Sequence, residues 1–249
     1  MPGENIAEYD HVPPALARPR NSVPGLFRRA VYGTVEVDFG IGVMPEIAVQ
    51  NSGATLPETA LTAALGRRSI VLVGMMGAGK SSIGRRLAVR LGLPFVDADT
   101  EIERAASMTI SEIFSAHGEA YFRAGEARVI VRLLEGGPQV LATGGGAFIN
   151  PETRTAIRAK GISIWLNATF DILMRRVKRR ADRPMLDGSD PVEALTRLIE
   201  ERYPVYAEAE LTVESRDVPH ETIVSEIITK LCNHPSLVGE AGNTEARGQ

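Results

Sequence analysis

Gly74-Met75-Met76-Gly77-Ala78-Gly79-Lys80-Ser81 is the most informative segment of this 249-residue chain. It fits the pattern G-x-x-x-x-G-K-[ST], in which glycines let backbone N–H groups turn toward phosphate oxygens. The β-branched run 69–73 before it predicts a buried strand, and residues 82–91 after it carry apolar side chains at helical spacing. A strand, this loop and a helix predict a nucleotide site, with Lys80 on the β- and γ-phosphates and Ser81 on Mg²⁺.

The composition excludes several classes of protein. A net charge of −3 gives no reason to expect nucleic-acid binding. The single Cys232 cannot form an intrachain disulfide, and no apolar run approaches the roughly 18 residues of a membrane span. The N-terminus lacks the basic and apolar regions of a signal peptide. We therefore expect a cytoplasmic monomer that binds neither nucleic acid nor membranes.

Residues 1–66 differ from the rest of the chain because prolines interrupt any helical periodicity. Residues 35–43 alternate in polarity like a strand, but one isolated strand is marginal. This region is a disordered extension, a small appendage or an upstream segment included by a wrong start site. We favour a largely disordered extension, with a short helix at 56–65 that ends at Gly66.

After residue 66, short apolar runs alternate with segments of helical periodicity as far as residue 232. This alternation predicts a parallel sheet covered on both faces, a three-layer α/β/α fold, followed by a mobile tail at 233–249. Ligands of such sheets bind beyond the C-terminal ends of the strands. The expected strands are 69–73, 94–97, 139–142, 162–166 and 211–213.

Several helix ends are also marked in the sequence. Thr109-Ile-Ser-Glu112 is a capping box, and a longer helix is expected from Glu119 to Leu134. Asn150-Pro151 opens a helix that Gly161 closes. A further helix begins at Asp190-Pro191 and is expected to end near Arg202.

Two segments that follow expected strands carry chemistry. Asp97 and Asp99 lie two residues apart at the end of their strand, a spacing that directs both side chains to the same face. One carboxylate can then hold Mg²⁺ while the other takes a proton from an acceptor hydroxyl. The alternative is a pair of solvated loop carboxylates or helix caps, and Asp99 could cap the helix at Thr100. Thr143-Gly-Gly-Gly146 removes side chains from a strand end and permits close approach of a ligand, although a plain turn has the same composition.

Arginines supply the remaining candidates. Arg123 and Arg202 lie on expected helices, where most arginines form surface salt bridges, but as bidentate donors they suit a carboxylate substrate. The basic cluster at 175–183 is either a solvated helix face or a lid that closes over ATP.

Together these motifs resemble shikimate kinases over about residues 69–231. The resemblance implies a five-stranded parallel sheet with a mobile lid. It also implies transfer of the γ-phosphoryl group of ATP to the 3-hydroxyl of shikimate, in the route to aromatic amino acids. The matched segments are 74–82, 95–99, 122–126, 143–146, 183–186 and 202–206, all in the family's order.

By the family pattern, Asp99 orients and deprotonates the hydroxyl, Arg123 and Arg202 bind the carboxylate of shikimate, and the glycines at 144–146 line the pocket. Ser81 binds Mg²⁺ and Asp97 supports the ion through water. Lys80 and, from the lid, Arg183 act on the transferring phosphoryl group. The implied ATP-binding residues are Gly77, Ala78, Gly79, Lys80, Ser81, Ser82, Arg176, Arg183 and, less securely aligned, Arg216.

Two other functions compete with this one. Another small-metabolite kinase, such as a gluconate-type enzyme, would not need the paired arginines and the triple glycine. A non-catalytic nucleotide-dependent regulator would be expected to lack Asp99, Arg123 or Lys80, and all three are present.

Overall fold

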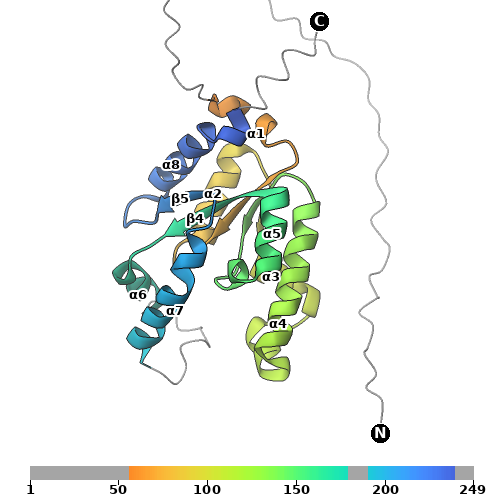
Figure 1. Ribbon diagram of the computed structural model, residues 1–249, viewed down its shortest axis with the longest axis vertical. Coiled ribbons are helices and arrows are strands. Elements are labelled where there is room, and N and C mark those ends of the chain that lie inside the picture. Colours follow the sequence, from red (N-terminus) through yellow and green to blue (C-terminus); the bar gives the residue numbers. More distant parts are fainter. Residues whose placement is uncertain (1–55, 179–189, 239–249) are drawn as a thin grey trace, which may run out of the picture. The chain divides into compact units, whose positions relative to one another are not determined.

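The computed structural model describes residues 56–178 and 190–238 (Figure 1). The predicted strand at 35–43 and Arg183 of the predicted lid lie outside the described residues. In chain order the elements are α1 (Glu58–Leu65), β1 (Ser69–Val73), α2 (Lys80–Leu91), β2 (Phe95–Asp97), α3 (Ala98–Ala106), α4 (Ile110–Glu135), β3 (Val140–Ala142), the 3-10 turn η1 (Ala147–Ile149), α5 (Pro151–Lys160), β4 (Gly161–Asn167), α6 (Phe170–Lys178), α7 (Pro191–Tyr206), β5 (Leu211–Glu214) and α8 (His220–Cys232).

The strands form one sheet in the order β2-β3-β1-β4-β5. All neighbouring pairs are parallel, and Val71 at the centre of β1 lies between Leu141 of β3 and Ser163 of β4. Every residue of β1 is buried, as expected of a central strand covered on both faces. The predicted α/β fold with a five-stranded parallel sheet is confirmed. The C-terminal ends of β1, β2 and β3 therefore share one edge of the sheet.

Two groups of helices cover this sheet (Figure 1). In the first group, α2 packs against α8, which also contacts α1, and α2 lies on β1, β2 and β3. In the second group, α4 packs against α5, which lies on β4. Figure 1 shows the first group at the upper left of the sheet and the second at the right. Fully buried side chains from both groups, Leu87 of α2 and Ile157 of α5, belong to one hydrophobic core.

The helix caps expected from the sequence are present. Thr109 accepts a hydrogen bond from the backbone N–H of Glu112, whose carboxylate accepts one from the N–H of Thr109 in return. The side chain of Asn150 accepts from the N–H of Glu152 at 2.8 Å and so caps α5. These reciprocal bonds satisfy N–H groups that the first turn of a helix leaves unpaired, which is why the sequence signal was reliable.

The helix expected from Glu119 is present as the second part of α4, and Gly118, with non-helical φ 81° and ψ 175°, separates it from the first part. One helix is longer than expected. Helix α7 continues past Arg202 to Tyr206, although Pro204 lies within it and cannot donate a backbone hydrogen bond. Tyr203 and Tyr206 both pack against Trp165, and this aromatic contact stabilises the extra turn.

The hydrophobic core extends beyond the domain that the sequence predicts between residues 67 and 232. Leu61 and Leu65 of α1 are buried, and the N–H of Leu56 donates to the carbonyl of Cys232 at 2.8 Å. Leu237, beyond the last predicted helix, is fully buried as well. Short flanking segments with a few apolar side chains thus complete the hydrophobic core.

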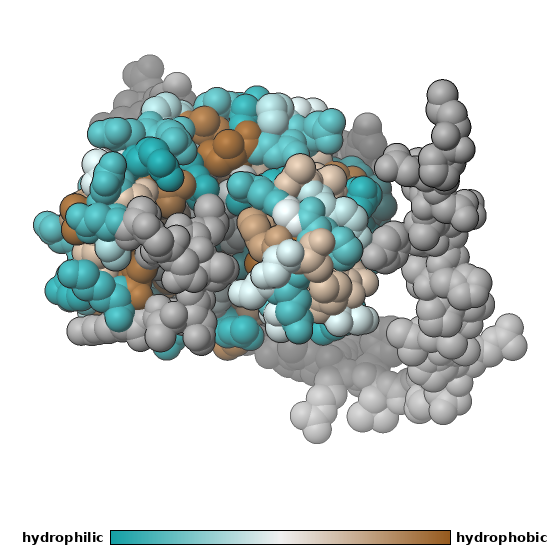
Figure 2. All heavy atoms as spheres, turned by 90° about the horizontal axis from the view of Figure 1, so that it is seen from below, coloured by the Kyte–Doolittle hydropathy of each residue, from teal (hydrophilic) through white to brown (hydrophobic). Residues whose placement is uncertain are grey.

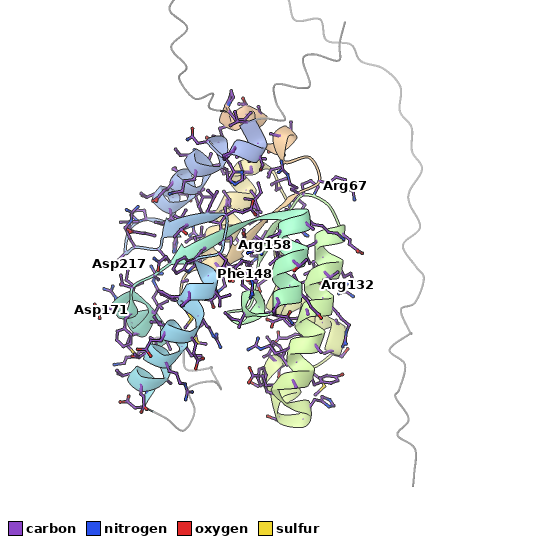
Figure 3. All side chains as sticks on the ribbon, in the orientation of Figure 1. Arg67, Arg132, Phe148, Arg158, Asp171 and Asp217 are labelled. Carbon is purple, nitrogen blue, oxygen red and sulfur yellow. The ribbon has the colours of Figure 1, made fainter. Side chains whose placement is uncertain are left out.

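Charged side chains lie mainly at the periphery. Figure 3 shows Arg67, Arg132, Asp171 and Asp217 on the outside and Phe148 in the interior, where it is 1% exposed. Within the described ranges, the structure contains no helix with the length and apolar character needed to cross a membrane.

Candidate active site

The glycine-rich loop joins β1 to α2 in the backbone conformation that its sequence pattern requires. Gly74, Gly77 and Gly79 have φ angles of 130°, 80° and 97°, which side chains disfavour. A Cβ atom on Gly74 would lie 2.8 Å from the carbonyl oxygen of Leu166. The Nζ atom of Lys80 donates to two carbonyl groups of the loop, the nearer at 2.8 Å. The loop therefore holds its cation directly above the first turn of α2.

A cavity of about 1240 Å³ opens at the C-terminal edge of the sheet. Figure 2 shows this side of the molecule, where hydrophilic surface surrounds smaller hydrophobic patches. The cavity brings together predicted residues from the loop, from the ends of β2 and β3 and from three further helices. Those that line it are Gly77, Gly79, Lys80, Ser81, Ser82, Asp97, Asp99, Arg123, Gly144, Gly145, Gly146, Arg176 and Arg202.

Three predicted site residues are not among the described residues that line the cavity. Ala78 is fully buried, and its carbonyl accepts a hydrogen bond from Ser215 at 2.7 Å. Arg216 directs its guanidinium to Glu226, at 2.6 Å, and only its carbonyl oxygen contacts Arg176. Arg183 lies outside the described residues.

Ser81 and Asp97 form an oxygen pair at the mouth of the loop. The Ser81 hydroxyl donates to Oδ2 of Asp97 at 2.6 Å. Asp97 also caps α3 by accepting from the N–H of Asp99, so Asp97, and not Asp99, is the helix cap. A hydroxyl and a carboxylate are hard oxygen donors that fit Mg²⁺, which commonly takes its remaining ligands from phosphates and water. No group of three or more His, Cys, Asp or Glu side chains in the described ranges offers a more complete metal site.

Asp99 lies in the first turn of α3 beside two other residues of the cavity. A Cβ atom on Gly144 would be 2.8 Å from Oδ1 of Asp99 and 2.6 Å from Oε1 of Glu126. Burial raises the pKa of Glu126, and the negative charge of Asp99 adds to this effect, whereas Arg123 opposes it. The absence of a side chain at Gly144 thus leaves space for two carboxylates against the strand end.

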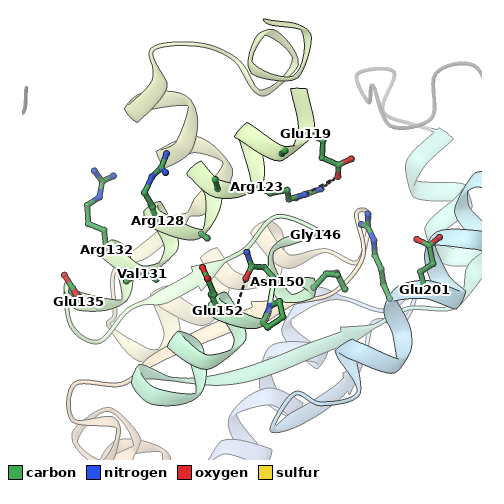
Figure 4. Close-up of a pocket in the computed structure, with 16 residues that line it drawn as sticks. Glu119, Arg123, Arg128, Val131, Arg132, Glu135, Gly146, Asn150, Glu152 and Glu201 are labelled. Atoms are coloured by element: carbon green, nitrogen blue, oxygen red, sulfur yellow. Dashed lines mark hydrogen bonds and ion pairs between the residues drawn. The ribbon is translucent and has the colours of Figure 1, made fainter. Parts of the chain in front are cut away.

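Arg123 is fixed by two glutamates of its own helix. Its NH1 atom donates to Glu126 at 2.7 Å. Its Nε and NH2 atoms donate to Glu119 at 3.3 and 3.2 Å, as seen in Figure 4. Burial alone would lower the pKa of Arg123, but the two carboxylates outweigh burial and raise it. The guanidinium lies where a Cβ atom on Gly146 would be, so the third glycine of the triplet is required for its position.

Arg202 reaches the same loop from α7. It is 8% exposed, and its NH1 atom donates to the carbonyl of Gly145 at 3.3 Å. The hydroxyl of Tyr206, one turn further along α7, donates to the same carbonyl. Burial raises the pKa of Tyr206 to about 12, so the phenol stays protonated and remains a donor.

Arg176 of α6 defines the opposite end of the cavity. Its NH1 atom donates to the carbonyl of Gly77 at 3.2 Å and to the hydroxyl of Ser215 at 2.9 Å, which places the guanidinium against the phosphate loop. His220 lines the cavity nearby. Burial lowers the pKa of His220, and the charges of Arg86 and Arg176 lower it further, so the imidazole favours its neutral form.

Comparison with known proteins tests the resemblance seen in the sequence. The family model for shikimate kinase matches residues 76–232. A curated shikimate kinase of Bradyrhizobium diazoefficiens is 66% identical over 184 residues, which cover 74% of this chain and 88% of the relative. One of Rhodopseudomonas palustris is 64% identical over 180 residues, which cover 72% and 89%. The chain belongs to the shikimate kinase family.

Solved structures of shikimate kinases agree with this assignment. The enzyme of Acinetobacter baumannii in complex with shikimate superposes with a TM-score of 0.67 at 35% identity, over 72% of this chain and 99% of that one. The enzyme of Bacteroides thetaiotaomicron gives a TM-score of 0.60 at 30% identity, over 64% and 96%. The chain is therefore an ATP-using kinase with the fold of its family.

Three residues in or next to the cavity were not assigned a role from the sequence. Glu126 was part of a matched motif, and its spacing of three residues from Arg123 allows a helical ion pair, but its burial has no local sign in the sequence. Tyr206 was likewise quoted in a motif, and its contact to Gly145 spans 61 residues. His220 follows a proline at a helix start and resembles an ordinary first-turn residue. Only long-range packing reveals their positions.

Proposed function

We propose how this chain performs the shikimate kinase reaction, the transfer of the γ-phosphoryl group of ATP to the 3-hydroxyl of shikimate. The observation that supports the proposal most is that the predicted phosphate-binding, base and carboxylate-binding residues line one cavity. Lys80 of the phosphate loop, the carboxylate of Asp99 and the guanidinium groups of Arg123 and Arg202 all line it. Phosphoryl transfer requires mainly alignment and charge compensation, and these groups supply both.

The donor half of the cavity binds ATP. Backbone N–H groups of residues 77–82 and the N-terminus of α2 bind the phosphates, and Lys80 compensates their charge. Arg176 lies at the entrance to the loop and binds the adenine end, while Arg183 acts on the transferring group from the lid. Ser81 would hold Mg²⁺, and Asp97, to which its hydroxyl donates at 2.6 Å, would support the ion. The ion, when bound, neutralises charge on the phosphate oxygens.

The acceptor half binds shikimate. Arg123 and Arg202 bind the carboxylate as charged hydrogen-bond donors, and the glycines at 144–146 let the ring approach the strand end. Phe114 and Phe122, whose ring centroids are 4.7 Å apart, give this half an apolar wall. The 3-hydroxyl then faces Asp99, which accepts its proton as the bond to phosphorus forms. ATP and shikimate are the substrates; a monomeric, cytoplasmic protein without a nucleic-acid partner remains a prediction.

Replacement of Arg202 by alanine tests the carboxylate clamp. Loss of a charged hydrogen-bond donor should raise the KM for shikimate about 10- to 100-fold, while the KM for ATP stays within about twofold. Arg197→Ala is the matched control, because Arg197 is an exposed arginine of the same helix that pairs with Glu201 at 3.9 Å. A KM for shikimate that is unchanged in Arg202→Ala, or equally raised in the control, contradicts the clamp.

A further inference from the structure

The guanidinium of Arg123 lies in a wall between two cavities. Besides the catalytic cavity, a second one of about 1130 Å³ lies between α4, the start of α5 and α7 (Figure 4). Arg123, Gly146 and Arg202 line both. The two predicted carboxylate-binding arginines are therefore accessible from two sides.

The nitrogen atoms of Arg123 are divided between the two sides. NH1 bonds to Glu126, which lines the catalytic cavity. Nε and NH2 both bond to Oε1 of Glu119, which lines the second cavity. This Nε–NH2 edge is one that carboxylates use for bidentate binding to arginine. The N–H groups at Nε and NH2, which a substrate carboxylate would need, are thus already bonded to a side chain of the protein.

The two glutamates differ in how firmly they are held. The side chain of Glu126 is 2% exposed, and releasing its partner would leave a buried charge uncompensated. The side chain of Glu119 is 60% exposed, so water can solvate it as soon as it leaves Arg123. Glu126 is therefore the permanent partner that positions Arg123, and Glu119 is the partner that can be replaced.

The backbone keeps Glu119 next to Arg123. The break in α4 at Gly118 comes directly before Glu119, and the helix that resumes there places Glu119 four residues before Arg123, a spacing at which helical side chains meet. Gly146 permits this arrangement, since the guanidinium occupies the volume that a side chain at this position would fill. Glu119 therefore lies beside Arg123 without help from other elements.

We propose that Glu119 is an internal competitor of the substrate carboxylate on Arg123 and thereby sets the affinity for the acceptor. The inference rests on the proposed function, in which Arg123 binds that carboxylate. A carboxylate-bearing acceptor displaces Glu119 and gains the edge of the guanidinium. An acceptor without a carboxylate leaves Glu119 in place and gains nothing from Arg123.

The test is Glu119→Gln, which removes the charge and keeps the shape. Titration calorimetry should give a dissociation constant for shikimate about two- to fivefold lower than that of the parent, the range of partly exposed ion pairs. The KM for ATP should not change, and the gain should shrink as salt screens the competing charge. Glu152→Gln is the matched control. Glu152 lines the same cavity, so this substitution makes the same change in charge there. Glu152 does not pair with Arg123, whose ion-pair partners among the described residues are Glu119 and Glu126.

An unchanged or weaker affinity for shikimate in Glu119→Gln, or an equal gain in Glu152→Gln, overturns the inference. Arg123→Gln separates this failure from failure of the proposed function. If Arg123→Gln weakens shikimate binding while Glu119→Gln does not strengthen it, the clamp stands and only the competitor is wrong. If Arg123→Gln leaves shikimate binding intact, Arg123 is not part of the clamp and both proposals fail.

Discussion

At Gly146, the absence of a side chain leaves the space that the guanidinium of Arg123 occupies. A Cβ atom there would lie 2.4 to 2.6 Å from three atoms of the Arg123 guanidinium, although φ of −99° is open to any residue. We expect Gly146→Ala to displace Arg123 and weaken shikimate binding at least about tenfold, since a charged hydrogen bond is lost. Calorimetric titration with shikimate and with ATP measures this, and ATP binding should not change.

Gly125→Ala is the control for that substitution. Gly125 lies on α4 two residues after Arg123, and a Cβ atom there would meet nothing within 4 Å. Alanine should stabilise the helix by up to about 1 kcal/mol and leave shikimate binding unchanged. If Gly146→Ala binds shikimate like the parent, the arginine is not held where the structure places it.

Glu126 should give the free energy of unfolding a recognisable dependence on pH. Burial raises its pKa in the folded chain above the ordinary value of 4.5. The carboxyl therefore contributes stability that is fully present below pH 4.5 and is lost as pH rises through the folded pKa. The free energy of unfolding of the parent minus that of Glu126→Gln should fall over this interval.

Urea unfolding of both proteins from about pH 4 to about pH 8 measures this difference. Only its slope is diagnostic, because the substitution also changes the packing and the hydrogen bond to Arg123, which offsets the difference as a whole. Glu152→Gln controls for the change in charge at an exposed site. A difference that is flat or rises with pH contradicts a raised pKa for Glu126.

At the scale of single residues, the sequence predicted groups whose role is encoded locally. The glycines and Lys80 of the phosphate loop act through backbone geometry within one turn, so their spacing alone identifies them. Asp97 and Asp99 were assigned from strand phase, but α3 begins at Ala98, and Asp97 is its cap. Glu126 and its partner Arg123 are three residues apart on α4, but the burial of the pair depends on packing against other elements. The contact of Tyr206 with Gly145 joins distant segments and leaves no local pattern.

At the scale of elements, α1 shows why the folded unit is larger than the sequence suggested. Glu58 of α1 binds the guanidinium of Arg90 on α2 through two hydrogen bonds of 2.8 and 2.9 Å, and Arg90 also donates to Ser225 of α8. Leu61 is fully buried between these helices. The helix was predicted correctly, but it contributes only two buried leucines, Leu61 and Leu65, too few for a sequence pattern to show that it belongs to the core.

Two changes to α1 test this contribution. Leu61→Ala should lower the free energy of unfolding by about 2 to 4 kcal/mol, the usual loss for a buried leucine. A chain that begins at Thr55 should keep full stability and activity, whereas one that begins at Arg67 lacks α1 and should lose stability. Urea unfolding and turnover with ATP and shikimate measure both. Equal stability of the two shortened chains contradicts a structural role for α1.

Helix α4 shows a feature that the sequence did predict. The capping box at Thr109 and the apolar periodicity after Glu119 predicted two helical segments. Both are present, and the non-helical backbone of Gly118, with φ 81°, separates them within α4. Glycine adopts this conformation without strain. The second segment begins at Glu119, so Glu119 and Arg123 lie four residues apart on one helical segment.

For the whole molecule, the sequence was sufficient to predict which edge of the sheet carries the site, but not the order of the strands. Alternation of strands and helices implies parallel pairing, and parallel strands align their C-terminal ends. The order β2-β3-β1-β4-β5 arises from pairing between segments far apart, which no local spacing encodes. It places β1 at the centre, so that the phosphate loop lies between the acceptor residues that follow β2 and β3 and the arginine of α6.

The central claim is that Asp99 accepts the proton of the shikimate hydroxyl while the loop at Gly74–Ser81 holds ATP. The most direct test is turnover of Asp99→Asn with saturating ATP, Mg²⁺ and shikimate, measured as ADP release, together with the dissociation constant for ATP. We predict that kcat falls at least about 100-fold, the contribution of a positioned general base, and that ATP binding does not change. Turnover near that of the parent chain would contradict the account.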